Sequence, residues 1–485
     1  MKRLAAILNK TKSTLFFVAV GLLFSLTQCN RGDSNSAGEN ADFQKPIENP
    51  TFVEHIAPIL SNHCLSCHRP QGIAPFSLNS YSLARKKSKT IAKVTAARIM
   101  PPWPADPNYS HFIGENLLSD AEITTIQNWV KQGAVEGDYA KKSVQIFSND
   151  NSLKVSSYKS SIGKPDLVIP ISPILIKGDG EDRFYLTKTH VKLPGNSVIA
   201  AMEFVPGNKD LVHHANGHLV LYPNGRKSTK HFENKSVNIT PGQYNEDFKQ
   251  LGLLNDDHSI PERVHSAVNY LPGVLGVKYP NDIGGIAVPK EFALALVDLH
   301  YGPSDRNTVD SSVVNVFFRN TPPTRPTYEI NLGTDGVGKI TPPLVVPPNQ
   351  ITQHSVSYTI EKPITILTIN PHLHLLGKSF KAFAIKPNGD TVKLISIPRW
   401  NFRWQYFYTF KMAQVLPAGS TITAIAQFDN TAGNPFNPNK PPKLVSERWE
   451  DGGNSMRASD EMFQFIITYI PYQKGDETLN LESKQ

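Results

Sequence analysis

Cysteine is scarce in this chain of 485 residues, which contains only Cys29, Cys64 and Cys67. Three cysteines cannot supply the dense disulfide framework that stabilises small exported folds. A chain of this length does not need one, because a domain with its own core takes roughly 100–200 residues. The sequence therefore predicts about two to four domains, stabilised mainly by buried apolar side chains.

Several motifs of nucleotide-binding, hydrolytic and nucleic-acid-binding proteins are also missing. The sequence contains no P-loop, no glycine-rich dinucleotide motif and no serine nucleophile elbow. The formal net charge is +8, but residues 1–28 contribute four Lys or Arg and no acidic residue, so the remainder carries only +4. No dense Lys/Arg stripe with interleaved aromatic residues is present, and we therefore expect no nucleic-acid partner.

Long apolar runs are absent beyond the N-terminus. Four basic residues precede an apolar run from Leu15 to Leu26. This run is too short for a membrane span but suits the core of a secretory signal. The segment Leu26–Cys29 then resembles a bacterial lipobox, with Gln28 in place of the usual small residue. An ordinary signal peptide with an incidental cysteine is the alternative.

The residues after this motif are polar and have little to bury. Asn30–Lys45 is rich in Asn, Ser, Gly and Asp, a composition that favours a flexible tether. We therefore predict a signal peptide in residues 1–28 and a tether in residues 29–50. The protein is expected to be exported from a bacterial cytoplasm, and to be either periplasmic or a lipoprotein anchored to the membrane through acylated Cys29.

Residues 51–140 carry the patterns of a small helical unit. Apolar residues recur at helical spacing in Phe52–Asn62. The segment Ser119–Glu122 forms a capping box, which starts another helix with Gly133 as its stop signal. The polar, Ser/Lys-rich residues 141–165 are expected to form a linker.

From residue 166 onward, the pattern changes to short apolar or alternating runs. Turns rich in Pro, Gly and Asn separate these runs, which is typical of β-sandwiches. The region is too long for one sandwich of about 100 residues. We therefore predict a first sandwich in residues 166–345, a second in residues 346–475 and a polar tail in residues 476–485. The expected fold class is mixed, with a small all-α domain followed by an all-β region.

The pentapeptide Cys64–His68 has the C-x-x-C-H pattern of covalent haem attachment. The thiols of Cys64 and Cys67 are spaced to bond the two vinyl groups of haem, and His68 then becomes an axial ligand of the iron. A redox-active cysteine pair and half of a zinc site are the alternatives. The adjacent histidine, the export signal and the lack of other cysteines argue against both. We therefore predict haem c in a cytochrome c-like domain spanning residues 51–140.

The second axial ligand of this haem is expected later in the same unit. Met100 begins the sequence Met-Pro-Pro-Trp, between the haem motif and the closing helix. A thioether ligand raises the reduction potential of the iron and suits electron transfer. The order of these motifs resembles small bacterial c-type cytochrome domains, which implies that Met100 is the ligand. His111 is the alternative.

Histidines cluster in three short motifs of the predicted β region. Two histidines that are two residues apart on a strand project from one face and can bind one metal ion. Adjacent histidines point to opposite faces of a regular strand, so they need a strand end or a bulge to share an ion. Imidazole suits copper or zinc, whereas a thioether favours copper. The candidate metal ligands are His213, His214, His300, His372, His374 and Met462.

In this order, the six candidates resemble the ligands of the copper type II, ascorbate-dependent monooxygenases, which include the peptidylglycine- and dopamine-hydroxylating enzymes. Further matches are HLHLLGK at 372–378, FDNTA at 428–432 and DEM at 460–462. The resemblance spans roughly residues 170–475 and implies two jelly-roll-like β-sandwiches with one copper ion each. It further implies that an electron-transfer copper is held by His213, His214 and His300, and that the O₂-binding copper is held by His372, His374 and Met462.

Other positions depart from the pattern of this family. The peptide-hydroxylating members carry an Arg before the His-x-His pair, a Tyr after the Met ligand and a Gln before the third histidine. The corresponding residues here are Asn370, Ile466 and Asp298. Animal members also have several disulfides, which this β region cannot form. These departures argue against a peptidyl-glycine substrate and leave the six metal ligands intact.

The sequence thus predicts an exported, copper-dependent monooxygenase that hydroxylates a C–H bond of an unknown small molecule with O₂. Its haem domain would take electrons from a periplasmic or membrane-bound donor and pass them to the copper of His213, His214 and His300. Tethering raises the effective concentration of such a donor. One alternative is a non-enzymatic haem and copper protein that transfers electrons or binds copper. Another is a binding or structural sandwich with incidental histidines.

Overall fold

The computed structural model describes residues 45–482, except residues 71–73, 143–145, 149–159, 161, 229–231, 240–248, 271–275, 281–282, 320–323, 335 and 448–458. The predicted signal peptide, Cys29 and most of the predicted tether lie outside the described residues. The described chain is mostly β-structure with a few helices near its beginning, which confirms the expected fold class at this level. Within the described residues, no helix is long and apolar enough to span a membrane.

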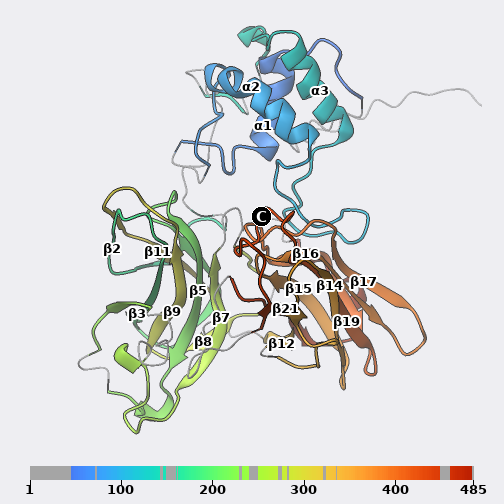
Figure 1. Cartoon of the computed structure of the whole chain (residues 1–485). Coiled ribbons are helices and arrows are strands. Elements are labelled where there is room, and N and C mark those ends of the chain that lie inside the picture. Colours follow the sequence, from blue (N-terminus) through green and yellow to red (C-terminus); the bar gives the residue numbers. More distant parts are fainter. Residues whose placement is uncertain are drawn as a thin grey trace, which may run out of the picture. The chain divides into compact units, whose positions relative to one another are not determined.

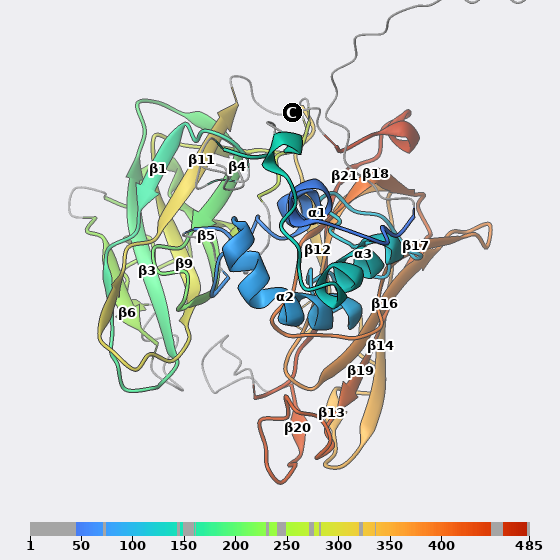
Figure 2. The same ribbon diagram turned by 90° about the horizontal axis from the view of Figure 1, so that it is seen from above.

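Among the described residues, the helical part of the chain contains three α-helices and shorter turns, coloured blue to green in Figures 1 and 2. Its elements are η1 (Phe52–Ile56), α1 (Ala57–His63), α2 (Tyr81–Ala96), α3 (Asp120–Lys131) and η2 (Tyr139–Lys141). At the start of α3, Ser119 Oγ accepts a hydrogen bond from the backbone N–H of Glu122, whose carboxylate accepts one from the backbone of Ser119. The predicted capping box is therefore confirmed.

One apolar core joins these helices. Phe52 and Trp129 are fully buried, and their ring centroids lie 6.3 Å apart. Ala84 and Ile91 contribute the buried stripe of α2 at helical spacing, while most of the basic side chains between them are exposed. An amphipathic helix packs against a core because its apolar stripe is buried there while its charged face stays in water.

Two sheets form the first β region. The five-stranded sheet has the order β6-β3-β9-β5-β7, and the four-stranded sheet has the order β1-β11-β4-β8. Leu219, Leu294 and Val314 come from both sheets and are fully buried in one common core. The strands are β1 (Leu167–Pro170), β3 (Arg183–Lys192), β4 (Ser197–Val205), β5 (Val212–Leu221), β6 (Lys235–Asn238), β7 (Glu262–Tyr270), β8 (Ile286–Val288), β9 (Glu291–Tyr301) and β11 (Val313–Arg319). A separate pair joins β2 (Ile174–Ile176) to β10 (Thr308–Asp310), and η3 (Pro223–Gly225) follows β5.

Two four-stranded sheets form the second β region, with the orders β12-β21-β15-β18 and β14-β19-β16-β17. Figure 2 shows β14, β16 and β19 side by side. The strands are β12 (Tyr328–Gly333), β14 (Ile351–Thr359), β15 (Ile364–Leu373), β16 (Gly377–Ile385), β17 (Thr391–Ile397), β18 (Tyr408–Leu416), β19 (Thr421–Asp429) and β21 (Phe463–Pro471). The pair β13 (Val345–Val346) and β20 (Val445–Ser446) and the turn η4 (Asp476–Thr478) complete the region.

Alternating burial explains why these segments form sheets. Strand β19 alternates between partly buried and fully buried residues along its whole length, the pattern of a strand with one face toward a core. Ile422, Ala424 and Phe428 on its buried face share a core with Ile369 of β15 in the other sheet. The predicted limits of the individual domains stay predictions.

Candidate metal sites

The first candidate site lies on the neighbouring strands β5 and β9 (Figure 1). His214 pairs with His300 in the register of these strands, whereas His213 falls within a register shift between Val212 and His214. Such a bulge lets adjacent side chains turn toward the same place, which a regular strand would not allow. One ligand-capable atom from each of His213, His214 and His300 lies within 4.8 Å of the other two. The structure thus brings these three predicted ligands together.

Carboxylates orient two of the three imidazole rings. The Nε2 atom of His300 lies 2.7 Å from Oδ1 of Asp182, and Nε2 of His214 lies 2.8 Å from Oδ2 of Asp298. A neutral imidazole that donates its Nε2–H to a carboxylate carries its lone pair on Nδ1. Among the described residues, no hydrogen-bond partner reaches the buried Nδ1 atoms of His213 and His300. Buried polar atoms of this kind need a partner, and a metal ion bound through Nδ1 fits that need.

The protonation of the three rings follows from their surroundings. Burial, with a smaller contribution in the same direction from the neighbouring His300 and His214, lowers the pKa of His213 to about 4. Burial and the neighbouring His214 also lower the pKa of His300. Burial opposes the charge of His214, but Asp298 outweighs it, so the pKa of His214 is raised. Because a metal ligand must be deprotonated, two of the rings are ready to bind and the third competes with a proton.

The second candidate site lies where β15 ends and β21 begins. His372 stands near the end of β15, His374 follows this strand, and Met462 directly precedes β21. The register pairs Leu373 with Phe463, so the His-x-His segment runs beside the backbone of Met462. The ring centroids of His372 and His374 lie 5.1 Å apart. Two central strands that are remote in sequence therefore bring these predicted ligands to one end of the sheet.

The carboxylate of Glu461 holds the two halves of this second site together. It is fully buried and accepts hydrogen bonds from the backbone N–H groups of His374 (3.1 Å), Leu376 (2.7 Å) and Met462 (3.2 Å). Burial raises the pKa of Glu461 to about 8, although the three N–H groups act in the opposite direction. Each buried donor left without a partner costs roughly 1–3 kcal/mol, so this side chain fixes the loop after β15 against the start of β21.

In the second site, the hydrogen bonds of His372 and His374 involve Nδ1 of each ring, whereas those of His214 and His300 in the first site involve Nε2. Nδ1 of His372 lies 2.7 Å from Oε1 of Gln405, and Nδ1 of His374 lies 3.0 Å from the backbone oxygen of Asp460. When Nδ1–H donates, the lone pair lies on Nε2. Burial, with the neighbouring His374, lowers the pKa of His372 to about 3. This ring is therefore neutral and fits a metal ion bound through Nε2.

An aromatic side chain contacts both groups of histidines. The ring centroid of Phe402 lies 6.4 Å from that of His213 and 5.9 Å from that of His374. Phe402 therefore lies beside the histidines, whereas Trp400, two residues earlier, is buried in the core of the second β region.

The cysteines and histidine of the predicted haem motif directly follow α1. Cys64 and Cys67 are free thiols, and Cys64 is the C-cap of the helix. Burial, with the neighbouring Cys67, raises the pKa of Cys64 to about 12. The Nδ1 atom of His68 lies 3.0 Å from the backbone oxygen of Phe76. A donated Nδ1–H leaves the lone pair on Nε2, the arrangement that an axial iron ligand requires.

The two candidates for the second iron ligand differ in their surroundings. Met100 is partly buried, and its backbone N–H donates to Val94 of α2 at 3.3 Å. His111 is exposed, and its Nδ1 lies 3.2 Å from a carboxylate oxygen of Glu115. This ion pair occupies one ring nitrogen and keeps the ring at the surface. The assignment of Met100 as the second iron ligand stays a prediction.

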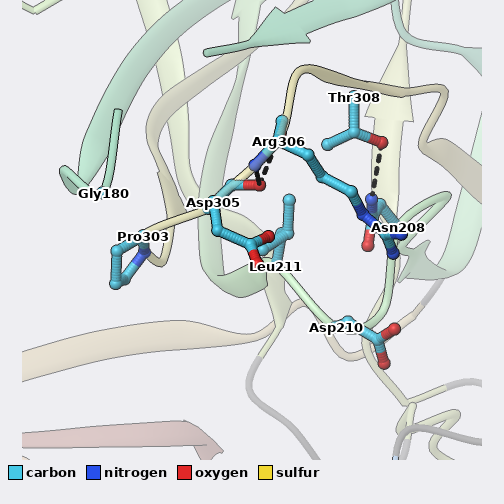
Figure 3. Close-up of a pocket in the computed structure, with 9 residues that line it drawn as sticks. Gly180, Asn208, Asp210, Leu211, Pro303, Asp305, Arg306 and Thr308 are labelled. Carbon is cyan, nitrogen blue, oxygen red and sulfur yellow. Dashed lines mark hydrogen bonds between the residues drawn. The ribbon is translucent and has the colours of Figure 1, made fainter. Parts of the chain in front are cut away.

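A polar pocket of about 470 Å³ lies beside the first candidate site (Figure 3). Leu211 lines it just before β5, and Pro303 lines it just after β9, so it opens at the strand ends that carry the histidines. Asp210, Asp305 and Arg306 place charges of both signs around it. The sequence did not predict this pocket, because its lining comes from turn residues that carry no recognisable motif.

No known protein-family model matches this chain. No curated protein matches it either. Among solved structures, the VP2 subviral particle of infectious bursal disease virus shares 10% sequence identity over 65% of this chain and 74% of that chain, with a TM-score of 0.16. Broad bean stain virus shares 8% identity over 70% and 94%, and PNGF-II shares 8% over 63% and 60%, each with a TM-score of 0.18. Such TM-scores carry no argument about this protein.

Sequence reasoning missed most of the residues that orient the candidate ligands. Asp182 and Gln405 belong to no motif, and Asp298 was noted only as a departure from a family pattern. Glu461 was noted only as part of a motif match. The sequence offered one signal for such an orienting residue, namely a polar side chain next to a candidate ligand. Glu461 has this position, because it directly precedes Met462.

Replacing Asp298 by Asn is expected to weaken copper binding at the first site by roughly 10–100-fold, because the ring of His214 loses its orienting carboxylate. Competition with a chelator of known affinity measures this change. The exposed Asp390, in the turn between β16 and β17, provides the control as Asp390→Asn. Equal copper affinities for the two variants would contradict the assigned role of Asp298.

Proposed function

We propose that this protein is an exported, copper-dependent monooxygenase that hydroxylates a C–H bond of a small molecule, with electrons supplied through a c-type haem. The observation that carries the proposal is the first histidine group, in which three imidazoles converge within 4.8 Å. In this proposal, the helical part is a cytochrome c-like domain, and the two β regions are jelly-roll-like sandwiches. Export would place the protein in the periplasm or on a membrane, where the haem meets its electron donor.

The donor atoms of the two sites support copper. Three imidazoles suit copper or zinc, whereas a thioether such as that of Met462, which we propose as the third ligand of the second site, favours copper, especially Cu(I). Copper bound at both sites would supply one-electron chemistry between Cu(II) and Cu(I). Hydroxylation places one atom of O₂ in the new alcohol and the other in water, and consumes two electrons and two protons. The haem iron, which also cycles by single electrons, suits the delivery of those electrons.

The residues of this chain would bind the metal ions and orient the ligand side chains. Asp182 and Asp298 hold two rings of the first group, while Gln405 and the backbone of Asp460 hold the rings of the second. Glu461 fixes the strand ends that carry the second group. Orientation of this kind keeps the ligands in place through each change of oxidation state.

A non-enzymatic electron-transfer or copper-binding protein is the alternative function, and one observation favours it. Asn370 stands where the peptide-hydroxylating enzymes have an arginine that grips the substrate. Here its side chain is buried and donates to the backbone oxygen of Tyr406 at 3.0 Å. This side chain is committed to the fold and cannot grip a substrate carboxylate.

Substrate-dependent O₂ consumption distinguishes the two functions. Reduced, copper-loaded protein is screened with small C–H compounds in an oxygen electrode. The Met462→Leu variant is expected to lose the stimulated O₂ uptake and keep its haem spectrum, because the thioether ligand is removed from the second site alone. Uptake that persists in this variant would contradict the assigned site. If no compound stimulates uptake while both copper ions are bound, the alternative function stands.

A further inference from the structure

The segment of residues 101–113, which we call the bridging segment, belongs in sequence to the predicted haem unit but packs into the second β region. Its residues Ala105 and Phe112 are buried in the core of that region. Phe112 forms an isolated antiparallel bridge with Phe410 of β18. The backbone N–H of Asp106 donates to Ser396 at 2.8 Å. Backbone pairing and burial together fix this segment to the β region.

The bridging segment begins directly after Met100, the proposed iron ligand. The hydroxyl of Tyr406 donates to the backbone oxygen of Pro102 at 2.8 Å. The ring of Trp103 lies 5.6 Å from the ring of Tyr406 and 5.6 Å from that of Tyr408, measured between centroids. The chain therefore passes in two peptide bonds from Met100 to a residue that is hydrogen-bonded to the second β region.

Tyr406 is also connected to the second histidine pair. Its chain neighbour Gln405 lies 2.7 Å from Nδ1 of His372 through Oε1. Its backbone oxygen accepts a hydrogen bond from Asn370, which stands two residues before His372 on β15. Two separate hydrogen bonds thus join the Tyr406 segment to the strand that ends in the His-x-His pair.

Cys67 of the haem attachment motif lies within electrostatic range of Tyr406. As a free thiol, Cys67 adds to the effect of burial in raising the pKa of Tyr406. Lys209 and Tyr270 of the first β region lie within such a range as well. Both β regions therefore neighbour the motif, and the hydrogen-bonded connection described above leads to the second.

We propose that Pro102, Tyr406 and Gln405 form the electron path from the haem held at Cys64–His68 to the metal held by His372 and His374. The inference rests on the proposed function, and it replaces the expected delivery to the first histidine group. One electron leaves Fe(II), which becomes Fe(III), and reduces Cu(II) to Cu(I). No covalent bond forms or breaks. Hydrogen-bonded and covalent contacts carry the coupling, and Tyr406 serves as a connector that keeps its proton.

Re-oxidation of the haem tests this path without any substrate. In copper-loaded, oxidised protein under argon, a light pulse through a photosensitiser reduces the haem, and haem absorbance then reports its re-oxidation. The Tyr406→Phe variant loses the hydrogen bond to Pro102 and keeps the aromatic ring. It is expected to re-oxidise its haem roughly three- to tenfold more slowly than the unmodified protein.

A matched control removes another contact of the same bridging segment. Ser110 Oγ donates to the backbone oxygen of Lys393 at 3.0 Å and lies outside the proposed path. The Ser110→Ala variant is expected to re-oxidise its haem at the unmodified rate. Equal slowing in Ser110→Ala and Tyr406→Phe would mean that general loosening of the segment causes the effect, and the path would be overturned.

Variants with one metal site removed identify the acceptor. His372→Ala is expected to lose the fast phase of haem re-oxidation, whereas His213→Ala is expected to keep it. The opposite result, with both sites shown to bind copper in the unmodified protein, would overturn the path and leave the proposed function standing. Copper analysis that finds no metal at either site would overturn both.

Discussion

The double variant Cys64→Ala, Cys67→Ala is expected to contain no covalent haem. Each thiol supplies one thioether bond to a vinyl group, so removal of both leaves no covalent attachment. Intact-protein mass and haem absorbance after denaturation measure the loss, which should be complete. Both candidate copper sites lie on the β regions, whose two cores contain neither cysteine, and copper binding should therefore persist.

The motif itself offers a control for this experiment. Ser66 lies between the two cysteines and is exposed, with only a long contact of 3.8 Å from its Oγ to Cys67 Sγ. The Ser66→Ala variant is expected to carry covalent haem in the normal amount. Haem that survives denaturation in the double cysteine variant would show that attachment does not depend on this motif.

Loss of one copper ion per chain is the expected result of replacing His300 by Ala. The imidazole of His300 lies at the centre of the first group, with ring centroids 5.0 Å from His213 and 4.9 Å from His214. Without it, only two imidazoles remain, and Asp182 loses its histidine partner. Metal analysis after gel filtration in a weak chelator measures the copper that remains, which should be the copper of the second site.

Another partly buried histidine of the same sheet provides the control. His190 of β3 contacts Phe232 and Glu291 and belongs to neither candidate site. The His190→Ala variant should retain the full copper content. If His300→Ala also retains it, the three converging imidazoles do not form a metal site, and the proposed function loses the observation that carries it.

Local signals in the sequence predicted local structure well. The capping box at Ser119 and Glu122 and the helical spacing after Phe52 appear in the structure as expected. Each depends on residues within a few positions of one another. The helix α2 was not predicted, because a run of Lys and Arg covers its exposed face and hides its narrow buried stripe.

Pairing between remote strands could not be predicted from the same signals. The adjacent His213 and His214 required a bulge or a strand end, and the register shift against β9 now supplies the bulge. Asp182 reaches His300 from a residue 118 positions away. The sequence alone does not show which carboxylate will orient a histidine, because the pairing of the strands decides which side chains meet.

The bridging segment shows the same limit at a larger scale. The sequence placed the whole segment, with Trp103 and Phe112, in the predicted haem unit of residues 51–140. In the structure, Phe112 is buried against Tyr408 and Phe410 of the second β region, with centroid distances of 5.0 Å. A single sequence shows that such residues are buried and does not show which core receives them.

The measurement that tests the central claim most directly is the content of copper and haem in protein matured in an export-competent host. The account predicts about two copper ions per covalent haem, and about one after replacement of His372 by Ala. Covalent haem without copper, even after reconstitution with Cu(I) and Cu(II), would contradict the two-site proposal. The six residues would then be no metal centre, and electron transfer by the haem unit alone would remain.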